Sequence, residues 1–559
     1  MEALLDEVLV MVLQYLDVPD LLACRLVSQR VGALVLHPCV WARRPFNPYD
    51  GEGRRRQWAG GDDDVGVLTQ CVCPVLRLSP CLGALHVVLP PPRWCPAALY
   101  SSTGCAAARL RLVVNGSIVA SKAAEFVRRQ EALGRLRFVD LAAYKGTGAG
   151  VSALLCTVLS VPGLEGLALS LVFRPDPTVA VACSSSATAP HLKRFHCNLD
   201  PWTEDLVNAV LVAHAATLEG VHLIRYTCYD GGIMTFHPET LSLLAGAPNL
   251  SELTCDCHPG LGAVPHESLT VLHLSMHYKQ AGCSTPSAVE EAAELLQRAE
   301  HLREVTLEYT FPHRPYADLF AGVDLVLALA SSRPSRVEKL TIQNNNYVYG
   351  VEVPGEVQIN VLVEGQVHVQ VHPVLQWEPS PDLKPCPQLQ QLISTLPSLP
   401  HLRHLQVGAV TTELLLALLC PDTVPALQRV ELSLEDVECI HEWLHQGDMV
   451  KGLMSARPSL HLELQANYCT LKYCKVCLQS CHKELWDERT ARALGFEPAR
   501  LGLFAHDPAE RCFVDHTADR RRWLRVPLVE VPCDANGRLF EVLDSVISSA
   551  LLASSNLKQ

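Results

Sequence analysis

A short pattern of the form L-x-x-L-x-L, with substitutions, recurs thirteen times along this chain. The copies begin at residues 82, 107, 133, 164, 192, 218, 250, 269, 302, 337, 402, 427 and 460. Most neighbouring copies lie 25 to 35 residues apart, a period typical of solenoid architectures. The interval from 337 to 402 is about two such periods, and the interval from 250 to 269 leaves no room for a full helix.

The segments between these copies have the apolar spacing of helices. Examples are EDLVNAVLVAHAA, SAVEEAAELLQRAEHL and PQLQQLISTLPSL, and Asp, Thr, Ser or Pro often stands at their starts. One strand and one helix cannot bury their own apolar faces, so successive units must stack and share a core. The sequence therefore predicts an α/β solenoid with a curved parallel sheet on its concave face, helices outside, and a cap at each end.

Residues 357–371 show a different period. In VQINVLVEGQVHVQV, the residues Val, Ile and Leu alternate with polar residues around Glu364-Gly365. Alternation on both sides of a turn predicts a β-hairpin. We expect this hairpin to occupy an insertion at about residues 351–375, inside the long interval of the repeat.

An apolar helix is expected at the start of the chain, in LLDEVLVMVLQYL. One helical stripe contains Leu5, Val8, Leu9, Val12, Leu13 and Leu16, and the stripe is widened by Val10, Met11 and Tyr15. A second helix follows in DLLACRLVSQR, with Pro19 in its first turn, and a short ALVL segment ends at His37-Pro38. About 40 residues are too few to bury apolar groups on several faces, so we expect a partner to cover part of this region.

This apolar run is not typical of a signal peptide, because Glu2, Asp6 and Glu7 are acidic and no Lys or Arg precedes Arg25. It is also too short and too acidic to span a membrane.

Residues 3–42 resemble the F-box in the order and spacing of their residues. The matching positions are Leu4, Asp6-Glu7-Val8-Leu9, Leu13, Tyr15-Leu16, Asp20-Leu21, Arg25-Leu26-Val27-Ser28, Arg30 and Trp41. Leu5 stands where the family usually has Pro, and Val31 where it usually has Trp. The resemblance implies docking onto the Skp adaptor, and through it the cullin, of an SCF (Skp, cullin, F-box) ubiquitin ligase. The adaptor-binding residues it implies are Leu4, Leu5, Glu7, Val8, Leu9, Leu13, Leu16, Leu21, Leu26 and Val27.

With its repeats, the whole chain resembles the F-box proteins with leucine-rich repeats. The organisation expected on this basis is an F-box at 1–46, a linker and N-terminal cap at 47–80, the repeats at 81–470, and a Cys-rich segment with a C-terminal cap at 471–559. The resemblance implies a substrate receptor that binds its protein substrate on the concave face for ubiquitination. The alternative is a leucine-rich-repeat scaffold or inhibitor whose N-terminal helices only cap the array.

No catalytic residues are expected in this chain. Neither a Ser-His-Asp triad nor an activated Cys-His pair can be recognised in the sequence. The glycines Gly146, Gly148 and Gly150 match neither phosphate-binding glycine motif. In the receptor interpretation, catalysis belongs to the partners, and the receptor increases the rate by holding the substrate near them.

Composition excludes some classes of partner and compartment. The net charge is −13, with 59 acidic and 46 basic residues, which argues against a nucleic-acid-binding surface. The 23 cysteines are fewer than a disulfide scaffold requires. We therefore expect reduced thiols and a cytoplasmic or nuclear protein that binds neither nucleic acid nor membrane.

Side chains between the apolar positions of each strand should line the concave sheet. The early repeats place basic residues there, namely Arg109, Arg111, Arg135, Arg137, Arg194 and His196, and the middle repeats place Glu252, Asp256, Glu304 and Glu308. Between the basic groups lie Gly166, Ala168 and Ser170, which predict a shallow gap. Arginines around a gap suit an acidic or phosphorylated substrate. The alternative is that they only solvate an exposed sheet.

One cluster of cysteines has the composition of a metal site. It contains Cys469, Cys474, Cys477, Cys481 and His482, including one C-x-x-C pair that could bind zinc. Further candidates are Cys512 and His516. The alternative is that these cysteines are buried, reduced thiols with no cofactor.

Overall fold

The chain divides into two compact units. One comprises Met1–His401 with Asp487–Glu497, and the other comprises Leu402–Trp486 with Pro498–Gln559. The computed structural model describes residues 5–46, 72–90, 98–145, 148–171, 191–199, 203–224, 239–277, 286–310, 323–331, 335–344, 352–353, 357–361, 367–371, 374–375, 387–408, 412–434, 448–466, 499–507, 512–514, 516 and 523–525.

The first unit begins with four short helices. They are α1 (Asp6–Leu13), α2 (Val18–Cys24), α3 (Gln29–Val35) and α4 (Pro38–Trp41). Pro19 lies in the first turn of α2, as its missing N–H favours. The predicted helix DLLACRLVSQR is interrupted, because the Ser28 hydroxyl accepts a hydrogen bond from the Val31 N–H and starts α3 there.

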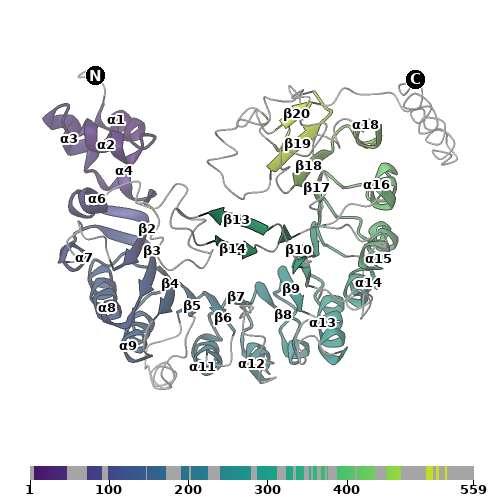
Figure 1. Cartoon of the computed structure of the whole chain (residues 1–559), viewed down its shortest axis with the longest axis horizontal. Helices are drawn as coiled ribbons and strands as arrows, with labels where there is room; N and C mark the ends of the chain where they lie inside the picture. Colours follow the sequence, from purple (N-terminus) through teal and green to yellow (C-terminus); the bar gives the residue numbers. More distant parts are fainter. Residues whose placement is uncertain are drawn as a thin grey trace. The chain divides into compact units, whose positions relative to one another are not determined.

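Eleven described strands of the first unit form a parallel sheet in sequence order. They are β1 (Pro45–Phe46), β2 (Cys81–Leu89), β3 (Ala106–Asn115), β4 (Phe138–Lys145), β5 (Gly166–Leu171), β6 (Arg194–Asn198), β7 (Gly220–Ile224), β8 (Glu252–Asp256), β9 (Val271–His277), β10 (Glu304–Thr310) and β11 (Lys339–Asn344). The order of the strands in the sheet follows their order in the sequence, so each strand neighbours the next one along the chain (Figure 1).

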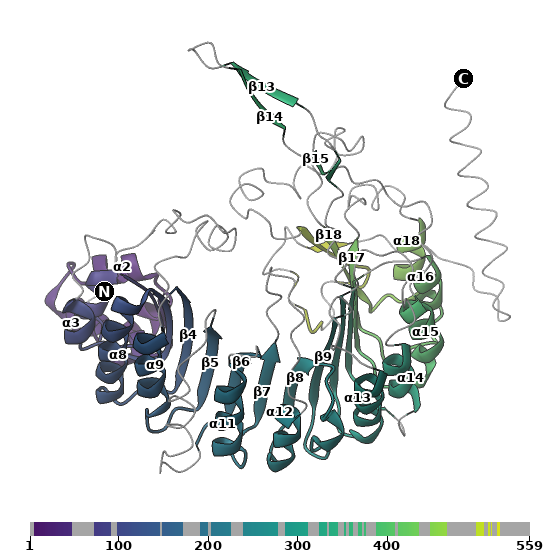
Figure 2. The same cartoon turned by 60° about the horizontal axis from the view of Figure 1, so that its bottom comes forward.

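The described helices of this unit after α4 are α6 (Val72–Leu78), α7 (Ala98–Ser102), α8 (Ser117–Ala132), α9 (Gly148–Leu159), α11 (Glu204–His214), α12 (Glu239–Ser242), α13 (Pro286–Arg298), α14 (Val323–Ser331) and α15 (Pro387–Thr395). Short 3₁₀ turns are η1 (Leu243–Gly246), η2 (Leu261–Ala263) and η3 (Leu396–Ser398). Helices α8 to α14 lie along one side of the sheet, and the other side of the sheet points away from them (Figure 2).

The core of this unit is a ladder of apolar side chains, one from each strand from β2 to β11. One row of register partners is Leu85, Leu110, Val139, Leu167, Phe195, Val221, Leu253, Leu272, Val305 and Leu340, all of them buried. Each such side chain contributes about 1.5–3 kcal/mol relative to exposure. The row explains why apolar residues must recur at a fixed position of every repeat.

The third copy of the sequence pattern is out of register. The sequence predicted it from residue 133, but β4 pairs Val139 with Leu110 and Leu141 with Leu112. The inward positions therefore belong to Leu136, Val139 and Leu141, three residues later. Residues 133–135 belong to the turn after α8, where Gly134 has a positive φ of 77°.

Two antiparallel pairs lie between β11 and α15 in the chain. β13 (Val357–Val361) pairs with β14 (Val367–Val371), which is the hairpin that the alternating sequence indicates. β12 (Glu352–Val353) pairs with β15 (Val374–Leu375) at the base of the same insertion.

The second unit contains the last three copies of the pattern. They correspond to β16 (His404–Val407), β17 (Arg429–Leu434) and β18 (His461–Ala466), which pair in parallel, with α16 (Thr412–Leu419) and α18 (Asp448–Ala456) between them in the chain. β19 (Ala499–Phe504) then pairs antiparallel with β18, and β20 (Trp523–Arg525) pairs in parallel with β19.

None of the helices in the described part of the chain combines the length and the hydropathy that a membrane crossing needs.

Candidate functional site

Helix α1 has two apolar faces. Leu9 and Leu13 are one helical turn apart and are buried against the other N-terminal helices. Val8, Met11, Val12 and, just past the helix end, Tyr15 follow a second stripe with spacing near i, i+3, i+4 and i+7. Of this second stripe, Met11, Val12 and Tyr15 are exposed. A helix that is apolar on two sides and covered on one is incomplete without a partner.

Exposed large apolar side chains concentrate in the N-terminal helical region, in α1 and in the turns beside the helices. Six of those that the described residues present lie within residues 5–27, and three lie elsewhere: Val212, Leu327 and Phe513. The six are Leu5, Met11, Val12, Tyr15, Leu26 and Val27, with Tyr15 and Leu26 91% and 87% exposed. Scattered single exposures are ordinary, but this density in one short segment is typical of a protein-binding surface.

Buried polar contacts hold these helices together. Arg44 donates hydrogen bonds to the carbonyl oxygens of Leu13 (2.7 Å) and Leu16, tying the end of α1 to the segment after α4. Burial lowers the pKa of Arg44, and the Asp17 charge opposes that shift. Trp41 is fully buried, and its Nε1 donates to the Val35 carbonyl (2.6 Å). These hydrogen bonds fix the positions of the helices that carry the exposed apolar side chains.

The structure divides the predicted adaptor-binding residues into different roles. Exposed members are Leu5, Glu7, Leu26 and Val27, half-buried members are Val8 and Leu16, buried members are Leu9, Leu13 and Leu21, and Leu4 lies outside the described residues. The buried three pack within the helical region and cannot present their side chains to a partner. The sequence did not assign Met11, Val12 and Tyr15 to binding, although their spacing as a second stripe is the signal that could have done so.

Two of the predicted substrate-binding arginines are paired with carboxylates. Arg111 Nε lies 3.2 Å from Asp140 Oδ2, and Arg137 Nε lies 3.6 Å from Glu165 Oε1. Burial raises the pKa of Asp140, while Arg111 acts to lower it. Arg135 lies in the turn before β4, and its Nη2 donates to the Ala42 carbonyl (3.4 Å). These three side chains therefore do not form a cluster of free positive charge.

The predicted gap at Gly166 is filled by an aromatic ring. Phe138 is the register partner of Gly166, and a Cβ placed on Gly166 would overlap the Phe138 ring. The Arg109 guanidinium stacks on the same ring, 4.7 Å from its centroid. On the other side of Gly166, Arg194 is exposed, and among the described residues no carboxylate pairs with it. The row therefore runs from Arg109 through Phe138 to Arg194.

The neighbouring strands carry histidines beside acidic residues. His196 stacks on His222 at 5.7 Å, and His222 Nε2 lies 3.0 Å from Glu252 Oε1. Burial, followed by the charge of His222, lowers the pKa of His196. Further along, Glu308 Oε2 lies 3.1 Å from His273 Nε2, and Glu304 pairs with Lys339. Asp256 is buried and Ser170 is half-buried. Because Glu252, Glu304 and Glu308 are paired with His or Lys side chains, the predicted change from basic to acidic repeats is smaller than their charges alone suggest.

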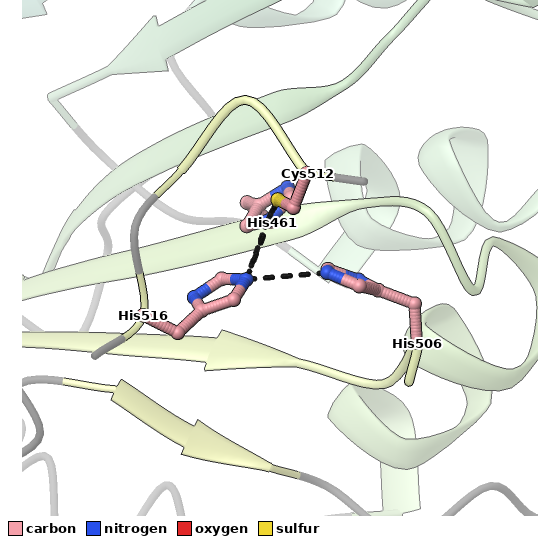
Figure 3. Close-up of side chains that lie close together, drawn as sticks. All are labelled: His461, His506, Cys512 and His516. Atoms are coloured by element: carbon pink, nitrogen blue, oxygen red, sulfur yellow. Dashed lines mark hydrogen bonds between the residues drawn. The ribbon is translucent and has the colours of Figure 1, made fainter. Parts of the chain in front are cut away.

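The predicted metal ligands Cys469, Cys474, Cys477, Cys481 and His482 lie outside the described residues. The further candidates Cys512 and His516 are described, and the fold brings them to His461 and His506 (Figure 3). The ligand atoms of these four residues all lie within 4.8 Å of one another. His461 is 45 residues or more from the other three in the chain, so no local spacing could have predicted it.

Comparison with known protein families identifies the N-terminal helices. Residues 6–46, which span α1 to β1, match the family model of F-box-like domains. No curated protein matches the chain. F-box domains generally bind Skp-type adaptors. The N-terminal region of this chain is therefore an F-box-like domain, and a long, mostly parallel, open sheet follows it.

Proposed function

We propose that this protein is the substrate-recognition subunit of an SCF-type ubiquitin ligase, not itself catalytic, in which the N-terminal helices bind the Skp adaptor and thereby the cullin. The observation that carries this proposal is the exposed apolar face of α1 and the following turn, within a segment that matches the F-box-like family model. Its function would place it in the cytoplasm or nucleus.

The rest of the chain would act as a leucine-rich-repeat solenoid that holds the substrate. A strand at each of thirteen recurrences of L-x-x-L-x-L, with helices on one side of the sheet, supports this interpretation. The face of the first unit's sheet opposite helices α8 to α14 would bind the substrate, with the row Arg109, Phe138 and Arg194 as its centre. Two guanidiniums that no described carboxylate pairs with, on either side of an aromatic ring, favour a substrate segment with acidic groups next to an apolar one.

Adaptor binding is tested with substitutions on the exposed face. In the full-length chain, Tyr15→Ser with Leu26→Ser should weaken binding to purified Skp adaptor at least about tenfold, since each buried apolar side chain contributes about 1.5–3 kcal/mol. Isothermal titration calorimetry measures the affinity. Because both side chains are almost fully exposed, the fold should be retained.

A matched control is Val212→Ser, which removes an exposed apolar side chain from α11 and should leave adaptor affinity unchanged. Leu9→Asp is not a suitable test, since it would place a charge in the core. If the unmodified protein does not bind the adaptor, the chain is better explained as a scaffold or inhibitor. An unchanged affinity in the double variant would show that another surface is used.

Substrate binding is tested separately by comparing proximity labelling with the unmodified chain and with Arg109→Ala/Arg194→Ala. The variant should lose specific labelled proteins and keep its adaptor affinity. An unchanged set of labelled proteins would contradict the assignment of this row.

A further inference from the structure

Four side chains from separate parts of the second unit converge on one point. His461 begins β18, His506 follows β19 by two residues, and Cys512 and His516 come from the segment between β19 and β20 (Figure 3). The antiparallel pairing places Phe504 opposite His461, so the chain leaving β19 passes directly beside the first residue of β18. Backbone hydrogen bonding thus positions two of the four side chains.

Four of the six distances between the ligand atoms are close to those of a tetrahedral metal site, and the other two are within 4.8 Å. His516 Nε2 lies 3.2 Å from both His461 Nε2 and His506 Nε2, and Cys512 Sγ lies 3.1 Å from His461 Nε2 and 3.4 Å from His516 Nε2. Tetrahedral zinc with ordinary bond lengths separates two nitrogen ligands by about 3.3–3.4 Å and a nitrogen from a sulfur by about 3.5–3.6 Å. Three of the observed contacts are within about 0.2 Å of these values, and the contact of Cys512 Sγ with His461 Nε2 is shorter by about half an ångström.

Hydrogen bonds cannot account for the cluster. In a neutral imidazole, one ring nitrogen carries either one proton or one in-plane lone pair, so His516 Nε2 can make one good hydrogen bond. Three heteroatoms lie within 3.4 Å of it, namely His461 Nε2, His506 Nε2 and Cys512 Sγ. At least two of these contacts would bring lone pairs or protons together without a bond. A cation at the centre would satisfy all four ligand atoms at once.

The surroundings also suit a bound cation. The Gln428 carbonyl lies 3.4 Å from His461 Nδ1, which favours a proton on Nδ1 and leaves the Nε2 lone pair for a metal. The Val514 N–H donates to Cys512 Sγ (3.2 Å), a contact that stabilises a thiolate. His461 and His516 are at most 9% exposed, and the Phe504 ring stacks on His516 at 4.0 Å. These contacts hold the ligands in place.

We propose that His461, His506, Cys512 and His516 bind a structural zinc ion. Imidazole and thiolate together favour zinc among the common divalent ions. Four protein ligands leave no open position for a substrate or water, so the ion would join β18 to the C-terminal segment and perform no reaction. This inference does not depend on the proposed ubiquitin-ligase function.

Metal content of the purified full-length protein is the first test. By plasma mass spectrometry, Cys512→Ser and His516→Gln should each contain about one zinc per chain less than the unmodified protein. Cys420→Ser, which changes an exposed cysteine of the same unit, should keep the full zinc content. Cys474→Ser with Cys477→Ser separates this site from the C-x-x-C pair and should also keep the zinc of the four-residue site.

Cobalt substitution is the second test, and its first measurement uses the unmodified protein. The unmodified protein loaded with Co²⁺ should show tetrahedral d–d absorption and a thiolate-to-cobalt charge-transfer band with the intensity of a single thiolate. In Cys512→Ser the charge-transfer band should be lost. The proposal is wrong if the unmodified protein binds neither zinc nor cobalt, or if all bound metal is lost in the Cys474/Cys477 variant and none in the Cys512 and His516 variants.

Discussion

Arg457 organises backbone within the second unit. It is 6% exposed and donates to the carbonyls of Leu418 (2.8 Å), Val424 (2.7 Å), Cys420 (2.7 Å) and Pro421 (3.0 Å). Burial lowers the pKa of Arg457, opposed by the charges of nearby acidic groups. The planar guanidinium can reach four carbonyls in one turn region, which a lysine ammonium cannot.

Replacing Arg457 should therefore destabilise the protein strongly. In Arg457→Met, each carbonyl left without a donor costs about 1–3 kcal/mol, so we expect the free energy of unfolding to fall by at least about 3 kcal/mol. Urea unfolding followed by circular dichroism measures this change. Arg298→Met is the control, because Arg298 is exposed and donates to one carbonyl, that of Gly262. Its expected loss is below about 1 kcal/mol, and equal losses in the two variants would contradict this account.

His214 predicts a dependence of stability on pH. Burial, followed by the charge of His191 at 5.3 Å, lowers the pKa of His214 to about 4. In the unfolded chain the pKa returns to about 6.5, so the unfolded state binds more protons between these values. The contribution of His214 to stability is therefore present above pH 6.5 and is lost as the pH falls towards 4.

We expect His214→Gln to lose less free energy of unfolding than the unmodified chain when the pH is lowered from about 7 to about 5. Urea titrations at the two pH values measure the difference. The exposed His301→Gln is the control and should behave like the unmodified chain. If His214→Gln loses as much free energy of unfolding as the unmodified chain, burial of His214 does not cause the loss of stability at low pH.

At the level of strands, the register between β4 and β5 determines where a glycine is required. The Phe138 ring lies over Gly166, and Arg109 stacks on the ring from the neighbouring strand. Gly220 occupies the corresponding position of β7, but the nearest atom to a Cβ there is Glu252 Oε2 at 3.5 Å, an ordinary contact. Glycine is therefore required for its small size at position 166, whereas position 220 has room for a methyl group.

Gly166→Ala should lower the free energy of unfolding by about 1–3 kcal/mol, because the new methyl group overlaps the Phe138 ring. Gly220→Ala should have a much smaller effect. Adding Phe138→Ala to Gly166→Ala removes the overlap, so the two changes should cost less together than the sum of each alone. Thermal unfolding of the four variants measures this coupling, and additive losses would show that the ring does not determine the requirement for glycine.

At the level of the whole chain, the two compact units carry different features. The first contains the F-box-like helices and the sheet face opposite helices α8 to α14, and the second contains the cluster of His461, His506, Cys512 and His516. All four proposed ligands belong to the second unit. The consequences of metal binding should accordingly be confined to that unit.

Metal removal tests this separation. After dialysis against a strong chelator, hydrogen exchange followed by mass spectrometry should increase in 461–466 and 499–507. Exchange in β2 to β10 should not change. The Cys512→Ser variant should show the increased exchange without chelator. Protection that is unchanged in 461–466 would contradict a stabilising ion, and increased exchange throughout both units would show that the metal stabilises more than its own unit.

Local periodicity was enough to predict the repeat strands, the hairpin at 357–371 and the α/β class. A repeated apolar spacing must reappear as a repeated buried row, as it does from Leu85 to Leu340. The spacing did not determine which residues of β4 point into the core. Two overlapping apolar patterns begin at 133 and 136, and only the pairing with β3 shows that the second one is used.

Relations between distant residues required the folded chain. Leu9 and Tyr15 are both apolar residues of one segment, and only packing against the other helices separates a core side chain from an exposed one. Arg111 and Asp140 neutralise each other across two strands, which changes a predicted basic surface into a paired one. His461 and His516 are 55 residues apart and meet because β19 returns antiparallel beside β18. Sequence spacing reports one turn or one strand at a time, whereas a binding site depends on distances that the sheet creates between them.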